Sequence, residues 1–219
     1  MISFENKYWL IDRIVVGDLM VNCYIVVWKA TSEAIIVDPG DEAPRIVSHL
    51  NALNATATAI VLTHGHGDHI GGNYALKEQL NLPIYIGEKD SDMLSDAWLN
   101  LSAPFGMDTT SPPASHTLFE ADIVRVGGGM LTVWETPGHS KGSISLAGNG
   151  FAIVGDLIFQ GSIGRTDFPG GSLELLLQMI TEKIYPLGDS CVLLPGHGEM
   201  TTVGEERRTN PFLQPGFRF

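Results

Sequence analysis

The sequence predicts an α/β protein of four layers, an αββα sandwich in which two sheets pack face to face under outer helices. Two observations indicate this fold. Short strands rich in Val and Ile lead into an amphipathic helix, and the same order then repeats in the second half of the chain. At 219 residues, the chain is expected to form a single domain over residues 1–219.

The first half is expected to form one sheet with its covering helices. A turn at Asp38-Pro39-Gly40 leads into a helix that Asp41 is expected to cap and whose apolar face includes Ile46 and Leu50. A later strand ends in a histidine-rich loop, and Gly71-Gly72 leads into a second, short helix. The expected strands cover residues 10–16, 23–28, 34–37, 59–62 and 82–86.

The second half repeats this pattern after a long loop. Residues 95–116 are rich in Ser, Pro and Asp, and this loop is expected to contribute to a substrate wall in which Trp98, Phe105 and Met107 are candidates. Ser172 is expected to cap a helix that ends at Pro186. The expected strands cover residues 123–126, 131–134, 143–146, 151–154 and 191–194.

The charge balance excludes some partners. The chain has 13 basic and 25 acidic residues, which gives a formal net charge of −12. Such a surface repels a phosphate backbone, so we expect no nucleic-acid partner. Its apolar runs fall short of the roughly 18–20 residues that span a bilayer, and its first residues do not resemble a signal peptide. We therefore expect no membrane association and a cytoplasmic location.

The most informative residues form one short cluster. The segment from Thr63 to His69 places His64, His66, Asp68 and His69 within six positions, separated by glycines that allow a tight turn. Imidazole and carboxylate groups suit zinc, iron or manganese, and no thiolate is present to favour a closed structural site. Four such side chains directly after a buried strand predict a metal site.

Three more candidate ligands each follow the end of an apolar strand. They are His139, Asp156 and His197. Side chains at strand ends converge on one edge of a sheet, so we expect these three to join the first cluster. The remaining histidines, His49 and His116, lie in no such context and are expected to be ordinary surface or helix residues.

Seven ligands exceed what one tetrahedral ion needs and instead suit two divalent ions, with zinc expected first and iron or manganese also suitable. Two such ions lower the pKa of a water between them, which would supply a bridging hydroxide nucleophile. Asp68 and Asp156 are therefore candidate catalytic residues. The expected ligand sets are His64, His66 and His139 for one ion, Asp68, His69 and His197 for the other, and Asp156 between both.

These motifs resemble the metallo-β-lactamase superfamily over nearly the whole chain. The glyoxalase II branch, the hydroxyacylglutathione hydrolases, is most similar, because it has an aspartate at the position of Asp156 and segments like Thr136-Pro137-Gly138-His139 and Gly155–Phe159. The resemblance implies an αββα sandwich, the same division of the seven ligands, and hydrolysis of S-lactoylglutathione or a related acyl thioester. It also suggests that Asp38 orients the histidine loop, with an ordinary turn residue as the alternative interpretation.

The sequence departs from this branch in two places. Glyoxalase II enzymes bind glutathione through a longer helical C-terminal region, whereas this sequence ends soon after Asn210-Pro211-Phe212 and has Gln214 where a basic residue is common; Arg218 is a candidate replacement. A shorter region predicts weaker or different thiol recognition. Second, Asp167 stands where the branch has a tyrosine that touches the substrate.

Two basic residues are candidates for substrate binding. Arg165 precedes Asp167 and keeps the charge that the branch has there, with an ion pair to Asp167 as the alternative interpretation. Lys141 follows His139 by two positions and could meet an anionic substrate, although a solvated lysine is the simpler interpretation.

An alternative function comes from the same segment. The stretch Gly164–Phe168 also resembles persulfide dioxygenases, which use one iron on the same fold. That interpretation requires His64, His139 and Asp156 as an open facial triad. A nuclease of this fold is disfavoured by the charge of −12. A small-molecule thioester, derived from glutathione, is the expected partner of the leading hypothesis.

Overall fold

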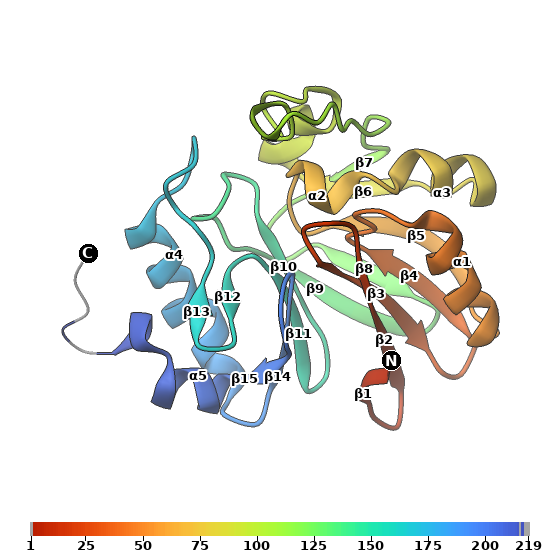
Figure 1. The fold of residues 1–219 in the computed structure, drawn as a ribbon. Helices are drawn as coiled ribbons and strands as arrows, with labels where there is room; N and C mark the ends of the chain where they lie inside the picture. Colours follow the sequence, from red (N-terminus) through yellow and green to blue (C-terminus); the bar gives the residue numbers. More distant parts are fainter. Residues whose placement is uncertain (1, 215, 217–219) are drawn as a thin grey trace.

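Two β-sheets pack face to face in the computed structural model, which describes residues 2–214 and 216, and helices cover the outer face of each sheet (Figure 1). The expected four-layer α/β fold is therefore confirmed. The first sheet contains, in spatial order, β1 (Ile2–Glu5), β2 (Trp9–Val16), β3 (Val21–Trp28), β4 (Glu33–Val37), β5 (Thr56–Leu62), β6 (Ile84–Gly87) and β7 (His116–Leu118).

The second sheet forms from the second half of the chain. Its spatial order is β15 (Thr201–Thr202), β14 (Val192–Pro195), β11 (Phe151–Gly155), β10 (Ile144–Ala147), β9 (Gly129–Glu135) and β8 (Ile123–Val126). A small hairpin of β12 (Ile158–Phe159) and β13 (Ser162–Ile163) follows β11.

Helices α1 (Ala43–Ala52) and α3 (Asn73–Leu80) lie on the first sheet, and α4 (Leu173–Met179) and α5 (Val203–Thr209) lie on the second (Figure 1). Helix α4 continues through a π-helical turn, Ile180–Ile184, and a 3₁₀ turn, Tyr185–Leu187. The remaining helices are α2 (Gly67–Ile70) and the 3₁₀ helices η1 (Glu88–Ser95), η2 (Ala103–Phe105) and η5 (Pro211–Leu213). No described helix is long and apolar enough to cross a membrane.

Three apolar cores separate the four layers. Along β3, alternate side chains point to opposite faces, so Cys23 and Ile25 join the core under α1 and α3, whereas Tyr24 and Val26 join the core between the sheets. The third core packs Val154 and other residues of the second sheet against α4 and α5. Because both faces of the central strands are buried, their sequences are nearly continuous apolar runs.

Some predicted element ends are wrong, and some elements were not predicted. Asp41 does not cap α1: the N-cap position is Glu42, which has a left-handed backbone (φ 52°) and no side-chain capping bond. Ser172 caps α4 as predicted, because its hydroxyl accepts a hydrogen bond from the Leu175 amide. The sequence pattern did not predict β1, β7 or α5, which are short or lack a clear apolar face.

Strand direction brings the functional loops to one edge. Strands β4, β5 and β6 are parallel to one another, and β11 is parallel to β14. The loops after β5, β11 and β14 therefore begin at the carboxyl-end edges of the two sheets. The two sheets meet there: the Asn22 amide donates to the Gly196 carbonyl at 2.7 Å, and the Tyr24 hydroxyl donates to the Pro195 carbonyl at 2.7 Å. The loop that follows β14 is thereby fixed to β3.

We predict that Tyr24→Phe lowers the free energy of unfolding by about 1 kcal/mol, the usual net value of one hydrogen bond. The loss stays small because the Asn22 side chain also donates to the Pro195 carbonyl, at 2.9 Å. Tyr24→Ala removes a fully buried ring as well and should cost about 3–5 kcal/mol. Urea unfolding followed by circular dichroism measures both values, and equal losses for the two variants would contradict this assignment.

Candidate metal centre

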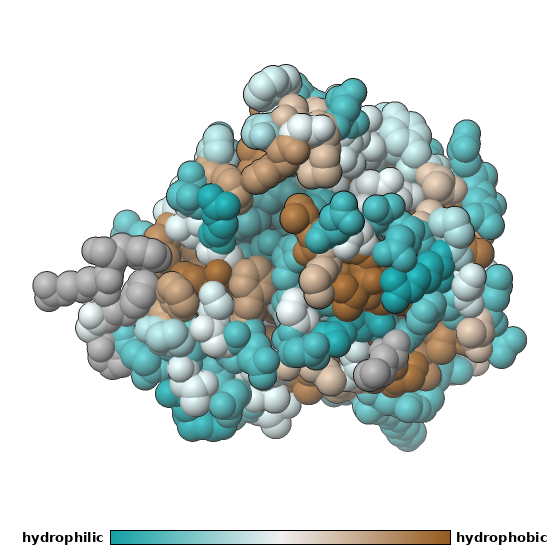
Figure 2. All heavy atoms as spheres, viewed as in Figure 1, coloured by the Kyte–Doolittle hydropathy of each residue, from teal (hydrophilic) through white to brown (hydrophobic). Residues whose placement is uncertain are grey.

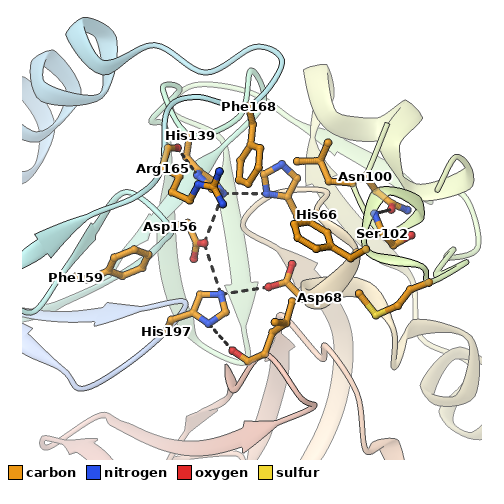
Figure 3. Close-up of a pocket in the computed structure, with 15 residues that line it drawn as sticks. His66, Asp68, Asn100, Ser102, His139, Asp156, Phe159, Arg165, Phe168 and His197 are labelled. Atoms are coloured by element: carbon orange, nitrogen blue, oxygen red, sulfur yellow. Dashed lines mark hydrogen bonds and ion pairs between the residues drawn. The ribbon is translucent and has the colours of Figure 1, made fainter. Parts of the chain in front are cut away.

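All seven predicted ligands lie together where the two sheets meet. Figure 3 shows His66, Asp68, His139, Asp156 and His197. Each comes from the end of a strand or from the short helix behind it. His64 and His66 follow β5, Asp68 and His69 lie in α2, His139 follows β9, Asp156 follows β11, and His197 follows β14. Three positions that are far apart in the sequence, His139, Asp156 and His197, thus share one site with the histidine cluster.

The side chains form three groups of three. Within each group, the ligand atoms lie within 4.8 Å of one another. Two of these groups correspond to the two expected ligand sets, and the third connects them through Asp156. The groups are His64, His66 and His139; Asp68, His69 and His197; and His64, His69 and Asp156.

Asp156 lies between the two outer groups. Its Oδ2 is 3.5 Å from His139 Nε2 and 3.6 Å from His197 Nε2, and its Oδ1 is 3.6 Å from His69 Nε2. The loop after β14 can come close to Asp156 because residue 196 is a glycine. A Cβ at that position would lie 2.1 Å from Asp156 Oδ1. The two oxygens of this carboxylate are therefore placed to face both groups.

Hydrogen bonds fix the orientation of four of the imidazoles. In each, Nδ1–H donates to an oxygen outside the cluster, so Nε2 carries the free lone pair and faces the site. The acceptors are Thr63 Oγ1 for His64 (3.1 Å), Asp38 Oδ2 for His69 (3.0 Å), the Arg165 carbonyl for His139 (2.7 Å) and the Leu19 carbonyl for His197 (3.0 Å).

Asp38 orients the histidine loop, as the resemblance suggested. One carboxylate oxygen accepts a hydrogen bond from the Thr63 amide at 2.7 Å. The other accepts from the Thr63 hydroxyl at 2.6 Å and from His69 Nδ1 at 3.0 Å. A buried carboxylate with three donors thus holds both the start of the loop and one of its imidazoles.

Electrostatics differ between the two outer groups. Burial and the neighbouring imidazoles lower the pKa of His64 well below its usual value and lower the pKa of His66 to about 3, so both rings are neutral. Burial also lowers the pKa of His69, but the carboxylates of Asp68, Asp156 and Asp38 outweigh it and raise this pKa to about 10. Without a metal ion the His69 ring therefore takes a proton at Nε2, the atom that would otherwise offer its lone pair to a cation.

The donor set fits divalent cations. His64 Nε2 and Asp156 Oδ1 are buried and have no hydrogen-bond partner, which is costly unless another group pairs with them. His69 Nε2 and His197 Nε2 approach to 3.3 Å although each ring uses its Nδ1–H elsewhere. Lone pairs that converge in this way suit cations that take nitrogen and oxygen ligands.

Asp90, which was not predicted, connects two ligand loops. Its carboxylate is buried and accepts hydrogen bonds from the Gly65 amide (3.1 Å), the Ser140 hydroxyl (2.6 Å) and the Gly142 amide (2.7 Å). Gly65 lies between His64 and His66, and Ser140 follows His139. One side chain therefore positions the complete first group.

A cavity of about 360 Å³ opens over the metal centre. Arg165, Phe105 and Met107 line it, but Lys141 and Trp98 do not. Gln214 also lies apart and donates to the Arg207 and Asn210 carbonyls; Arg218 is outside the described residues. The other residues that line the cavity are Leu19, His66, Gly67, Asp68, Asn100, Leu101, Ser102, His139, Asp156, Phe159, Phe168 and His197.

Arg165 combines both interpretations of its sequence position. Its guanidinium lines the cavity and also makes a two-point ion pair with Asp167, with Nε–Oδ1 and Nη2–Oδ2 distances of 2.9 and 2.8 Å. It also stacks over the Phe168 ring at 4.1 Å from the centroid. Two of its five N–H donors are therefore used within the chain.

An αββα sandwich with histidine and carboxylate ligands at one edge of its sheets defines a class of metal-binding proteins. The family model described as the metallo-beta-lactamase superfamily matches residues 16–197, and the chain belongs to that superfamily.

Relatives and solved structures match almost the full length. The chain is 34% identical over 207 residues to "Hydroxyacylglutathione hydrolase GloC" of Haemophilus influenzae, covering 93% of this chain and 97% of that protein. It is similar to the BLEG-1 B3 metallo-beta-lactamase, with a TM-score of 0.89, 38% identity, and coverage of 93% and 99% of the two chains. TTHA1623, solved in a di-iron-bound form, has a TM-score of 0.81, 32% identity, and coverage of 92% and 100%.

We predict that Asp90→Asn weakens metal binding by about 10–100-fold, the usual effect of losing a residue that orients metal ligands. The amide group places an NH₂ against the backbone and hydroxyl donors that the carboxylate now accepts from. A chelator competition titration measures the affinity. Asp92→Asn, an exposed change in the same short helix, is the matched control. Equal affinities of the two variants would refute the role of Asp90.

We predict that Asp156→Ala loses most of its bound metal, because the change removes the carboxylate shared by both groups. Elemental analysis of the purified variant gives the number of ions per chain, and circular dichroism checks that the fold is kept. Two ions per chain in this variant would count against a bridging role.

Proposed function

We propose that this protein is a metal-dependent hydrolase that cleaves acyl thioesters of small thiols, with S-lactoylglutathione as the reference substrate. The observation that carries the proposal is the position of Asp156 between two complete three-residue ligand groups. The similarity to the Haemophilus influenzae protein named hydroxyacylglutathione hydrolase supports the choice of a thioester.

The ligand groups would hold two divalent ions, for which zinc is the first candidate. His64, His66 and His139 would hold one ion, and Asp68, His69 and His197 the other, with Asp156 shared. Iron is a further candidate, because TTHA1623 is described in a di-iron-bound form. When bound, two such ions lower the pKa of a water between them and polarise a substrate carbonyl.

The remaining residues orient the ligands and shape the space for the substrate. Asp38 and the Leu19 and Arg165 carbonyls keep the Nε2 atoms facing the cavity. The Asp68 side chain is 20% exposed and lines the cavity, so its carboxylate can orient a water for attack on the carbonyl. A thiolate is a weak base, so it can leave without being protonated first, and the reaction needs no strong general acid.

The described site favours this reaction over the alternative of a mononuclear iron dioxygenase. A facial triad needs only three ligands with open positions, for which His64, His139 and Asp156 would suffice. That interpretation assigns no role to Asp68, His69 and His197, although these three side chains form a ligand group of their own.

Hydrolysis of β-lactams is a second candidate function. The observation in its favour is the 38% identity to the BLEG-1 B3 metallo-beta-lactamase over 93% of this chain. A lactam carbonyl requires the same attack by water, but its nitrogen leaving group needs a proton. The sequence offers no obvious general acid for that step, so we rank this reaction below thioester hydrolysis.

We predict that protein loaded with zinc, iron or manganese hydrolyses S-lactoylglutathione under anaerobic conditions, with release of thiol measured by a colorimetric reagent. Asp156→Ala should lower kcat/KM by at least about 1000-fold, because both ligand groups lose their shared carboxylate. Oxygen uptake with glutathione persulfide and cleavage of a chromogenic cephalosporin test the alternatives. A fully metal-loaded protein that cleaves no thioester would refute the proposal.

A further inference from the structure

The cavity over the metal centre has apolar walls. Hydrophobic side chains reach it from the β2–β3 turn, from the 95–111 segment, from β12 and from the loop before α4. In Figure 3, Phe159 and Phe168 lie on the side of Asp156, and Asn100 and Ser102 lie on the opposite side. The apolar lining residues are Leu19, Leu101, Phe105, Met107, Phe159 and Phe168.

The neutral polar side chains of this wall are already hydrogen-bonded within the chain. Asn100 donates to the Thr109 carbonyl at 2.8 Å and accepts from the Ser102 amide at 3.0 Å. The Ser102 hydroxyl accepts from the Thr109 amide at 3.1 Å and contacts the Thr109 carbonyl at 3.3 Å. Both residues are buried, so they give the segment its shape and offer little to a ligand.

Positive charge is scarce around the cavity. Among the described lining residues other than histidines, Arg165 is the one cation, and Asp167 occupies two of its donors. A neighbouring cavity of about 420 Å³ shares Leu19, Gly67, Asp68 and Met107 with the first and is also lined by the exposed carboxylates of Asp18, Asp41 and Asp108. Away from the ligand groups, the cavity walls therefore favour a group without negative charge.

Two of the apolar lining residues are largely exposed. Phe105 is 62% exposed and Met107 is 41% exposed, and both belong to the 95–111 segment that borders the cavity. Figure 2 shows hydrophobic surface on both sides of the hollow below this segment. Exposed apolar side chains at the entrance of a concave site gain free energy when a ligand covers them.

We propose that this site selects thioesters with a large, uncharged, apolar acyl group, such as phenylacetyl or hexanoyl, over the small hydroxylated lactoyl group, and that Phe105 and Met107 determine this preference. The inference rests on the proposed hydrolysis. Water adds to the thioester carbonyl, the C–S bond breaks, and a carboxylate, a thiol and a proton result. The apolar acyl chain lies against the cavity wall during this step.

The test uses thioesters that share one uncharged thiol, N-acetylcysteamine, so that only the acyl group varies. For the metal-loaded protein we expect kcat/KM for the phenylacetyl and hexanoyl esters to exceed that for the lactoyl ester by about 10–100-fold. The double variant Phe105→Ser/Met107→Ser should lose most of this ratio, because kcat/KM for the apolar esters falls much more than kcat/KM for the lactoyl ester. Trp98→Ser is the matched control, because Trp98 is 73% exposed in the same segment but does not line the cavity.

A binding measurement separates this inference from the proposed function. Non-cleavable analogues carry a CH₂ group between the carbonyl and the sulfur, and calorimetry gives their affinity for the metal-loaded protein. Tighter binding of the apolar analogues, lost in the double variant, supports the inference even if no thioester is cleaved, which would refute only the hydrolase. Equal or better use of the lactoyl ester, or analogue affinities that do not differ, would overturn the inference.

Discussion

The contact between the two sheets at the carboxyl ends of their strands is the constraint on which the site depends. Asn22 and Tyr24 of the first sheet bind the loop after β14 through the Gly196 and Pro195 carbonyls. Without this contact, His197 would not lie near the histidine loop that follows β5. Neither half of the chain contains a complete site, so the ligand cluster exists only when the two sheets are packed together.

Groups that bind no metal themselves set the direction of the ligands. Asp38 and Asp90 are buried carboxylates, and each accepts a hydrogen bond from a backbone amide of the histidine loop. Asp38 also binds the His69 ring, and Asp90 also binds the Ser140 hydroxyl. Main-chain carbonyls do the same for His139 and His197. The imidazoles are thus oriented by the fold, which reduces the conformational freedom that metal binding would otherwise have to remove.

The sequence predicted the layers and the ligand cluster because both rest on local patterns. Apolar runs revealed the central strands, and the spacing in the segment from His64 to His69 revealed the ligands. Asp90 could not be predicted, because it stands in a polar stretch and acts through contacts with Gly65 and Gly142 that only the fold creates. Backbone acceptors such as the Leu19 carbonyl cannot be recognised from the sequence either, since every residue has a carbonyl.

The reaction and the substrate are determined by different parts of the molecule. In the proposed reaction, attack on a carbonyl depends on the ligand groups, which lie at strand ends, whereas the cavity wall comes from irregular segments with no hydrophobic periodicity. The charge of −12 alone did not indicate the proposed preference for an apolar acyl group, because that proposal rests on local contacts: Asp167 engages Arg165, and Asn100 and Ser102 bond within their own segment. In the proposed function, substrate choice therefore follows from how the wall residues hydrogen-bond to one another, since the same kind of ligand groups can serve different substrates.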